Sequence, residues 1–315
     1  MAGVLAELKE TWRQTIPKFE KDQELLVHKL PYCGLRNAPY AWKESLPFPS
    51  YWPYGMPRQV KSFRDRVIYL GYVPYQLAIA WNKFDEEDDQ LGDLKTHVQA
   101  SVQRYGQLPT VLIYEYFNGT AVELPQLYQA YDGAGLFSAT DGDGNARLGA
   151  SGGNIITGTG VTASGVLHDI AVAQQRFMQF IDPNAAKPIF DEDMVTYNNL
   201  EAIIPITMNE IFQKATNAEY IRVDPGSITS ETNYLKGTFK YRISPFLTDT
   251  SDWYIVVRHP YYRPFLYRTP KDVETVIADI NNSDHARETN ENIIYTHIRN
   301  AIGVWFPGVI IKVNN

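Results

Sequence analysis

Residues 31–59 read PYCGLRNAPYAWKESLPFPSYWPYGMPRQ and combine six prolines with seven aromatic residues. Proline lacks a backbone N–H and biases the residue before it towards extended geometry. The prolines therefore exclude a helix here and make a central strand of a sheet unfavourable. Its ring surface is too large to leave in water, because burying each ring contributes favourable free energy. Two interpretations follow from these residues: a loop packed over its own domain, or an arm that lies on a neighbouring subunit.

The next segment, residues 63–81, changes to a period of two. Val67 and Tyr69 share one face, and apolar residues alternate again from Tyr75 to Trp81 after a break at residues 71–74. This alternation predicts a β-hairpin. Its faces are only half apolar, so we expect one side of the hairpin to be exposed or to meet a partner.

A long helix is predicted to follow. Asp85 offers an N-cap before further acidic residues, and Asn118 and Gly119 supply the stop. Gly106 and Pro109 should kink this helix or split it in two. The apolar stripe recurs at intervals of three or four residues: Leu91, Leu94, Val98, Val102, Tyr105, Leu108, Leu112 and Tyr116.

The rest of the chain mixes short strands and helices around a glycine-rich stretch at residues 131–160. The local patterns predict helices at 4–12, at 164–181 with Ser164 as cap and an inner face reaching Met178 and Ile181, at 208–215 and at 270–280. They predict strands at 202–205, two within 237–257, and one each at 264–268 and 304–313.

Composition bounds the class of protein. The chain has 315 residues, of which 44% are hydrophobic and 21% charged, enough for a sizeable core in one or two domains. Its net charge of -7 argues against a dedicated nucleic-acid binder, although a shell around nucleic acid need not be basic. The single cysteine, Cys33, predicts a reducing compartment and a buried free thiol. The first 24 residues contain no apolar run that suits a signal peptide or a membrane span.

Motifs for enzymatic chemistry are missing from the sequence. The six histidines show no metal-binding spacing, and no nucleotide-binding glycine loop occurs. Residues 141–145, DGDGN, imitate the start of a calcium loop, but Ala146 and Gly152 stand where such a loop needs glycine and glutamate, which favours a solvated turn. Residues 259–271, HPYYRPFLYRTPK, could bind single-stranded nucleic acid or form a half-buried strand, and we favour the strand.

The order of arm, hairpin, long helix and mixed α+β body resembles the Hong Kong 97 fold of tailed-phage major capsid proteins. Local sequences are similar to those of the Mu-like prophage major head subunit family over about residues 50–313. The similar pieces are Arg64-Asp-Arg-Val-Ile68, Asp88-Asp89-Gln-Leu-Gly92, Tyr131-Asp132-Gly133 with Phe137, Asn199-Leu-Glu-Ala-Ile-Ile-Pro205, and Gly237 through Pro245-Phe-Leu to Trp253-Tyr.

This resemblance implies an α+β subunit with an N-terminal arm (1–58), an extended β-hairpin loop (59–84), a peripheral domain with a spine helix (85–150), an axial domain (151–262) and a return to the peripheral domain (263–315). It implies no catalytic residue, metal or cofactor. The implied function is that of a major capsid protein, which self-assembles into an icosahedral shell around phage double-stranded DNA.

The implied partners are copies of the chain in pentamers and hexamers, packaged DNA contacted non-specifically, and candidate scaffolding, portal and decoration proteins, with no membrane. The implied location is the virion capsid, assembled in the host cytoplasm. Our candidate intersubunit contacts are Trp42, Trp52, Tyr54, Arg64, Arg66, Tyr69, Tyr75 and Trp81.

Two alternatives stay open at this point. An encapsulin-like bacterial compartment would share the fold and differ in its cargo. A soluble α+β enzyme or binding protein would instead be a monomer or small oligomer with a deep polar pocket.

Overall fold

The protein is described from a computed structural model that divides into two compact units. The units are residues 1–38, 70–113 and 266–302, and residues 39–69, 114–265 and 303–315. The structure describes residues 25–43, 49–58, 60, 65–88, 96–97, 100–101, 104, 106–120, 129–182, 186–222, 230–233, 235–268, 274–278 and 283–315. The helix predicted at 4–12, Arg64 and the stripe residues Leu91, Leu94, Val98, Val102 and Tyr105 lie outside these ranges.

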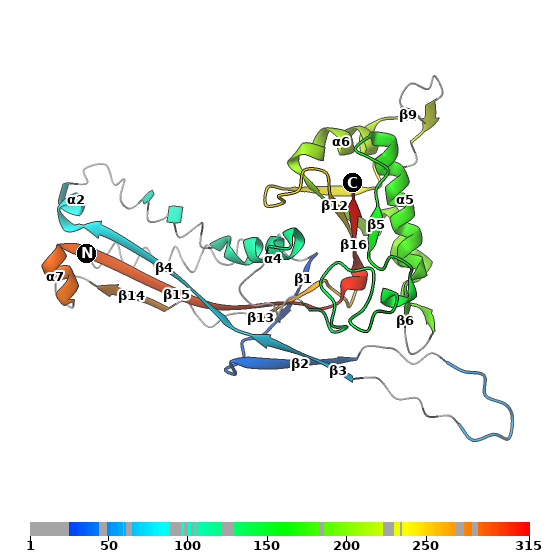
Figure 1. The fold of residues 1–315 in the computed structure, drawn as a ribbon, viewed down its shortest axis with the longest axis horizontal. Helices are drawn as coiled ribbons and strands as arrows, with labels where there is room; N and C mark the ends of the chain where they lie inside the picture. The colour runs from blue at the N-terminus through cyan, green and yellow to red at the C-terminus, as the bar shows by residue number, and fades with distance from the viewer. Residues whose placement is uncertain are drawn as a thin grey trace. The chain divides into compact units, whose positions relative to one another are not determined.

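The second unit is built on a five-stranded mixed sheet in the order β11-β8-β12-β16-β5 (Figure 1). The strands are β5 (Ile155–Thr157), β8 (Leu200–Pro205), β11 (Lys240–Ser244), β12 (Trp253–Val257) and β16 (Ile310–Asn314). Both predicted strands within 237–257 are present, but they pair with β8 on its two sides, β11 parallel and β12 antiparallel. Every residue of β8 and β12 is buried, so these strands form the core.

Two helices pack with this sheet, and Figure 1 shows α5 running beside β5. Helix α5 (Ala163–Gln179) is capped by Thr162, whose hydroxyl accepts from the Gly165 N–H at 3.1 Å, so our choice of Ser164 as cap is wrong. Its inner face includes Val166 and Ile170, whereas Met178 and Ile181, predicted to be inner residues, are partly exposed. Helix α6 (Asn209–Asn217) confirms the helix predicted at 208–215 and packs Phe212 on Trp253.

Shorter elements complete the second unit. They are the 3-10 turns Arg147–Gly149, Glu192–Val195, Tyr197–Asn199, Ile206–Met208 and Pro307–Val309, the strand pair β6 (Ile181–Asp182) and β7 (Lys187–Pro188), and the strand pair β9 (Tyr220–Arg222) and β10 (Ser230–Thr232).

The first unit is organised by the long strand β15 (Glu291–Val304). Strand β4 (Val73–Asn82) pairs along one side of it, and β14 (Glu274–Ala278) and β13 (Phe265–Arg268) pair with it as well. Strand β1 (Val27–Leu30) extends this sheet beside β13, and the helices α2 (Lys83–Asp88) and α7 (Asp284–Thr289) are short. The strand predicted at 264–268 is confirmed, and the one predicted at 304–313 is interrupted by the turn at 307–309 before β16.

The helix predicted at 270–280 is wrong, because residues 274–278 form β14. Three of its five residues, Thr275, Val276 and Ile277, are β-branched, which lowers helix propensity and suits a strand. The neighbouring β15 supplies the hydrogen-bonding partner, in the antiparallel register Glu274 opposite His297. Strand β15 itself was not predicted.

The two strands predicted for the hairpin are present as β3 and β4, but the predicted pairing between them is wrong. Strand β3 (Asp65–Gly71) pairs with β2 (Asn37–Lys43), whereas β4 pairs with β15. Lys43 forms an ion pair with Asp65 at one end of the β2–β3 ribbon, and the Tyr72 N–H donates to the Arg36 carbonyl at the other, so β2 and β3 run antiparallel. The hairpin is therefore formed by β2 and β3, joined by residues 44–64, and β4 continues from β3 after one residue.

The predicted interruption and end of the long helix are confirmed. Gln107 is a turn residue, and helix α4 (Leu108–Asn118) begins just after it with Pro109 in its first turn, where proline is tolerated. Gly119 has a φ of 67°, and the Thr120 N–H donates to the Glu115 carbonyl at 3.1 Å, closing the helix end. No helix within the described ranges is long and apolar enough to cross a membrane.

Candidate assembly surfaces

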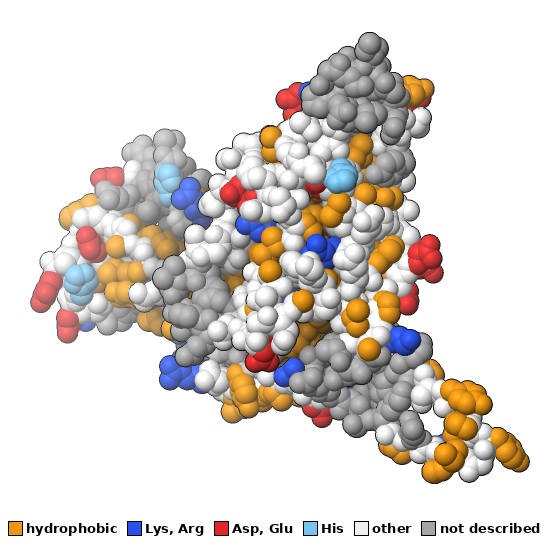
Figure 2. Space-filling model, turned by 45° about the vertical axis from the view of Figure 1, so that its right-hand side comes forward, with side chains coloured by type: hydrophobic (Ala, Val, Ile, Leu, Met, Phe, Trp, Pro, Cys, Tyr) orange, Lys and Arg blue, Asp and Glu red, His pale blue; other side chains and the backbone are white. Residues whose placement is uncertain are grey.

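The chain that joins β2 to β3 presents large apolar side chains to solvent. Tyr54 is fully exposed, Tyr51 is 89% exposed, and Trp52 and Met56 are more than half exposed, as is Val60. We call residues 49–60 the tip loop. Figure 2 shows hydrophobic side chains gathered at this loop, at the lower right of the view. Contiguous exposed apolar surface of this kind marks an interaction site more often than a free surface.

Local contacts give the tip loop a defined shape. The Met56 N–H donates to the Pro53 carbonyl at 3.2 Å, and Gly55 has a φ of 83°, the geometry that a type II turn requires of its third residue. The Trp52 indole N–H donates to the Met56 carbonyl at 2.6 Å, and the Arg58 guanidinium lies 5.0 Å from the Trp52 ring centre. The turn and the Trp52 ring are therefore held in one arrangement, which reduces the entropy lost when a partner binds the loop.

The predicted contact residues separate into several groups. Trp52, Tyr54 and Tyr69 are exposed, and Tyr69 lies on the outer face of the β2–β3 ribbon. Trp42 is only 6% exposed, so its ring is already covered within its own chain. The remaining described candidates are half-buried: Arg66 near Tyr131, and Tyr75 and Trp81 on one face of β4. Whether these side chains meet a neighbouring subunit stays a prediction.

The sequence reasoning missed three exposed members of the tip loop, namely Tyr51, Met56 and Val60. Tyr51 lies within the aromatic segment from which the prediction started. Pro53 and Gly55 also flank Tyr54 in a turn-forming pattern, which could have placed all of these residues at the apex of a loop.

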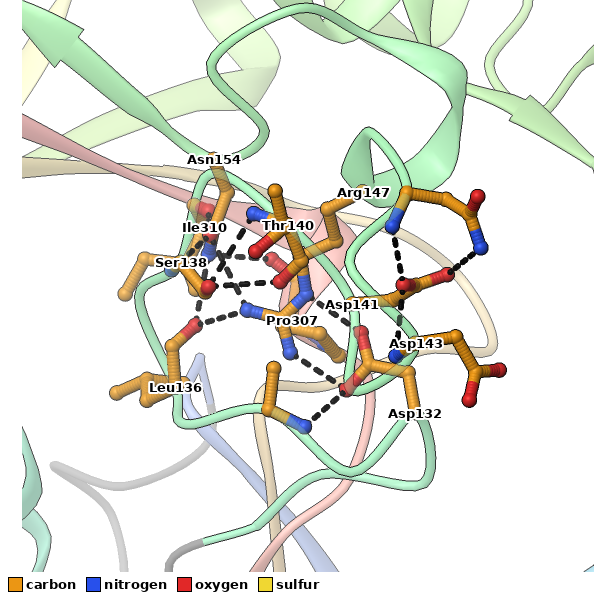
Figure 3. Close-up of polar contacts among 12 residues, drawn as sticks. Asp132, Leu136, Ser138, Thr140, Asp141, Asp143, Arg147, Asn154, Pro307 and Ile310 are labelled. Atoms are coloured by element: carbon orange, nitrogen blue, oxygen red, sulfur yellow. Dashed lines mark hydrogen bonds and ion pairs between the residues drawn. The ribbon is translucent and has the colours of Figure 1, made fainter.

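A second irregular segment, residues 129–154, is held by buried polar contacts (Figure 3). Arg147 is almost fully buried and makes a bidentate ion pair with Asp132, with Nε at 2.6 Å from Oδ2 and Nη2 at 2.9 Å from Oδ1. Its Nη1 also donates to the Leu136 carbonyl at 3.0 Å. The buried Asn154 amide donates to the carbonyls of Leu136, Pro307 and Ile310 and accepts from the Ser138 N–H. The buried polar groups of Arg147 and Asn154 therefore find their hydrogen-bond partners within the same chain.

This network explains the sequence pattern around Tyr131-Asp132-Gly133. Asp132 carries the ion pair, and Gly133 has a φ of 78° that favours glycine. Phe137 stacks on Tyr254, with ring centres 5.1 Å apart. These residues therefore have structural roles in the subunit.

The loop at residues 141–145 forms a turn around its own aspartate. Asp141 Oδ1 accepts from the N–H groups of Asp143 and Asn145, at 3.0 and 2.8 Å, which is the hydrogen-bonding pattern of an aspartate turn. Within the part of the chain that the structure describes, no three His, Cys, Asp or Glu residues cluster in a way that could hold a metal ion. Cys33 is a free thiol that is half-buried, whereas we predicted it to be buried.

Residues 258–264 form a loop that leads into β13. Phe265, Leu266, Tyr267 and Arg268 are all buried, which confirms the strand, although it is buried on both faces rather than half-buried. In the loop, His259 Nδ1 accepts from the N–H groups of Tyr261 and Tyr262, at 3.1 and 3.0 Å. Burial, together with the charge of Arg263, lowers the pKa of His259 to about 4.

Comparison with solved structures identifies the fold. The chain is similar to the capsid of an empty GTA particle, with 8% identity, 93% of this chain and 89% of that chain covered, and a TM-score of 0.57. It is similar to the capsid of Ralstonia phage GP4, with 10% identity, coverages of 93% and 90%, and a TM-score of 0.55. For the mature capsid of bacteriophage PhiM1 the identity is 8%, the coverages are 92% and 86%, and the TM-score is 0.53.

The class defined by these matches is the phage major capsid fold of the Hong Kong 97 type, and the chain has that fold. No protein-family model and no curated protein matches the sequence. The similarity to the Mu-like prophage head subunits therefore stays a prediction, while the capsid fold that it implied is confirmed.

Proposed function

We propose that this chain is a major capsid protein, which self-assembles into an icosahedral shell that encloses phage double-stranded DNA. The observation that carries the proposal is the combination of the capsid fold over nine-tenths of the chain with a preorganised tip loop whose rings are exposed in the isolated subunit. Exposed aromatic side chains are favoured anchors of protein interfaces.

The solved neighbours named above are the shells of phages and of a GTA particle, which favours a virion capsid over an encapsulin-like compartment. A capsid subunit has no catalytic role, so we expect no enzymatic activity. Pentamers and hexamers, scaffolding, portal and decoration proteins, and non-specific contact with packaged DNA belong to the same proposal.

The corrected strand pairing also changes the proposed division of the subunit. We propose that the extended loop comprises residues 37–71, with the tip loop at its apex, in place of residues 59–84. Strand β4 then belongs with the peripheral sheet around β15. The axial domain is the part of the chain that carries the β11-β8-β12-β16-β5 sheet.

The test is assembly of the purified protein, followed by sedimentation and electron microscopy. We expect closed shells from the unaltered chain, and a loss of at least tenfold in the assembled fraction for the double variant Trp52→Ser/Tyr54→Ser. Tyr261→Ser is the matched control, because it removes an exposed ring, 71% exposed, from another loop of the same unit. A chain that stays monomeric or forms only small oligomers, with or without scaffolding protein, would overturn the proposal.

A further inference from the structure

The β2–β3 ribbon has two unlike faces. Along β2, Tyr40 and Trp42 point to the covered face, while Pro39, Ala41 and Lys43 are exposed. A two-stranded ribbon is at best marginally stable in water by itself, so the direction in which it carries the tip loop depends on what holds the covered face.

Trp42 is held by a cage of four aromatic rings. The walls come from three separate parts of the chain and all meet the indole edge to face: Tyr131 at 5.2 Å between ring centres, Tyr262 at 5.9 Å, Trp305 at 5.8 Å and Phe306 at 6.1 Å. Each such pair contributes favourable free energy beyond the burial of its area. The interplanar angles lie between 76° and 85°, so the four rings together restrict the plane of the indole.

The walls of the cage are themselves fixed. Phe306 stacks on Tyr131 at 2° between planes and on Tyr262 with ring centres 4.5 Å apart. The Trp305 and Phe306 N–H groups donate to the carbonyls of Pro264 and Arg263, at 2.7 and 3.3 Å. The Tyr262 N–H donates to His259, and Tyr131 adjoins the ion-paired Asp132. The cage is therefore a rigid part of the body of its unit.

The second strand of the ribbon contacts the same wall. The Arg66 guanidinium carbon lies 5.8 Å from the centre of the Tyr131 ring, within the range of a cation–π contact. Both strands are thus held at the cage, and Trp42 precedes Trp52 by ten residues, a length that spans at most about 35 Å when extended. A small rotation at the cage would displace the tip loop by several ångströms.

We infer that Trp42 is a positioning residue, whose ring fixes the direction of the β2–β3 ribbon and so presents the tip loop to the neighbouring copy of the chain. The inference rests on the proposed function for its consequence in assembly. The positioning itself is a property of the single subunit and is measurable without any assembly. Trp42 therefore influences assembly only by orienting the ribbon, while Trp52 and Tyr54 contact the neighbouring copy.

The experiment measures the distance between spin labels on the tip loop and the body in the unassembled subunit. Met56→Cys and Gln175→Cys provide exposed labelling sites on the tip loop and on α5, in a Cys33→Ser background. We expect a narrow distance distribution in the parent, a width that at least doubles in Trp42→Ala, and recovery in Trp42→Phe, which keeps a ring in the cage. Trp42→Leu, which fills more of the cage, replaces the alanine variant if that variant does not fold.

Assembly provides the second readout. The assembled fraction should fall at least tenfold in Trp42→Ala and stay within twofold of the parent in Trp42→Phe, with circular dichroism unchanged in both. An unchanged width in a folded Trp42→Ala or Trp42→Leu subunit would overturn the inference even if shells form. A parent that keeps the narrow distribution but forms no shells would instead count against the proposed function alone.

Discussion

Two irregular segments of this subunit differ in how their side chains are satisfied. Residues 129–154 and residues 49–60 both depend on glycine or proline turns and carry few regular elements. In the first, Arg147 and Asn154 are buried and fully engaged with neighbours in the same chain. In the second, Tyr51 and Tyr54 are left in solvent. The first segment therefore stabilises the subunit, whereas the second leaves apolar side chains exposed in the single chain.

The largest effect on subunit stability is expected from Arg147→Ala. This change leaves the carboxylate of Asp132 without its bidentate partner, and breaking a buried pair in this way costs about 3–5 kcal/mol. Chemical denaturation should show that loss. Lys214→Ala is the control, because it breaks an exposed ion pair with Glu210 and should leave the unfolding midpoint nearly unchanged. Equal stability of the two variants would show that residues 129–154 do not depend on this ion pair.

A smaller change in the free energy of unfolding is expected when the pH is lowered, because His259 then becomes protonated in the unfolded chain. Its pKa is about 4 in the folded chain and near 6.5 when unfolded, so between these values only the unfolded chain takes up the proton. The contribution of neutral His259 to stability is complete above pH 6.5 and is lost progressively as the pH falls, and this loss amounts to about 3 kcal/mol at pH 4.

Denaturation curves at several pH values check this slope. In His259→Asn the side-chain oxygen can still accept the two N–H groups of residues 261 and 262 but does not titrate, so the slope between pH 6.5 and 4 should be shallower. A slope identical to that of the parent would mean that other groups set the acid sensitivity.

Hydrogen exchange should separate the two segments in the assembled state. Amides of residues 135–154 are expected to exchange at the same rate in monomer and particle, because their partners lie in the same chain. Amides of residues 49–60 should become at least tenfold slower to exchange in the particle. Equal rates for residues 49–60 in the two states would reduce the tip loop to an ordinary surface loop.

The smallest effect on stability is expected from the tip loop itself. Tyr54→Ser removes a fully exposed ring, so the unfolding free energy of the monomer should change by less than about 0.5 kcal/mol. Assembly should nevertheless weaken, because each contact is repeated around a closed shell. A large loss of monomer stability would show that the ring packs within its own subunit.

The corrected topology changes which deletion tests the extended loop. Removing residues 64–80 would take away β3 and most of β4, which pairs with β15 over ten residue pairs, and should unfold the first unit. Removing residues 51–58 leaves both ribbon strands intact and takes only the tip loop. A folded subunit that no longer assembles is the expected result of this shorter deletion.

The sequence alone determined the features that depend on neighbouring residues. Asn118 and Gly119 end α4, a turn after Gly106 precedes it, Pro109 stands in its first turn, and apolar runs mark β8 and β12. Caps, turns and backbone restrictions act within a few residues, so the sequence contains them. The proline-rich segment also left two interpretations open for its rings, and Trp52 and Tyr54 are exposed in the single chain.

Only the tertiary structure decided which strands pair and which rings are covered. Strands β3 and β4 follow each other in sequence, yet they pair with β2 and β15, and residues 274–278 become a strand because β15 lies beside them. Trp42 and Trp52 look alike in sequence, and only the rings of Tyr131, Tyr262, Trp305 and Phe306 bury the first of them. The physical reason is that strand pairing and ring burial depend on partners distant in the chain, whose positions no local pattern contains.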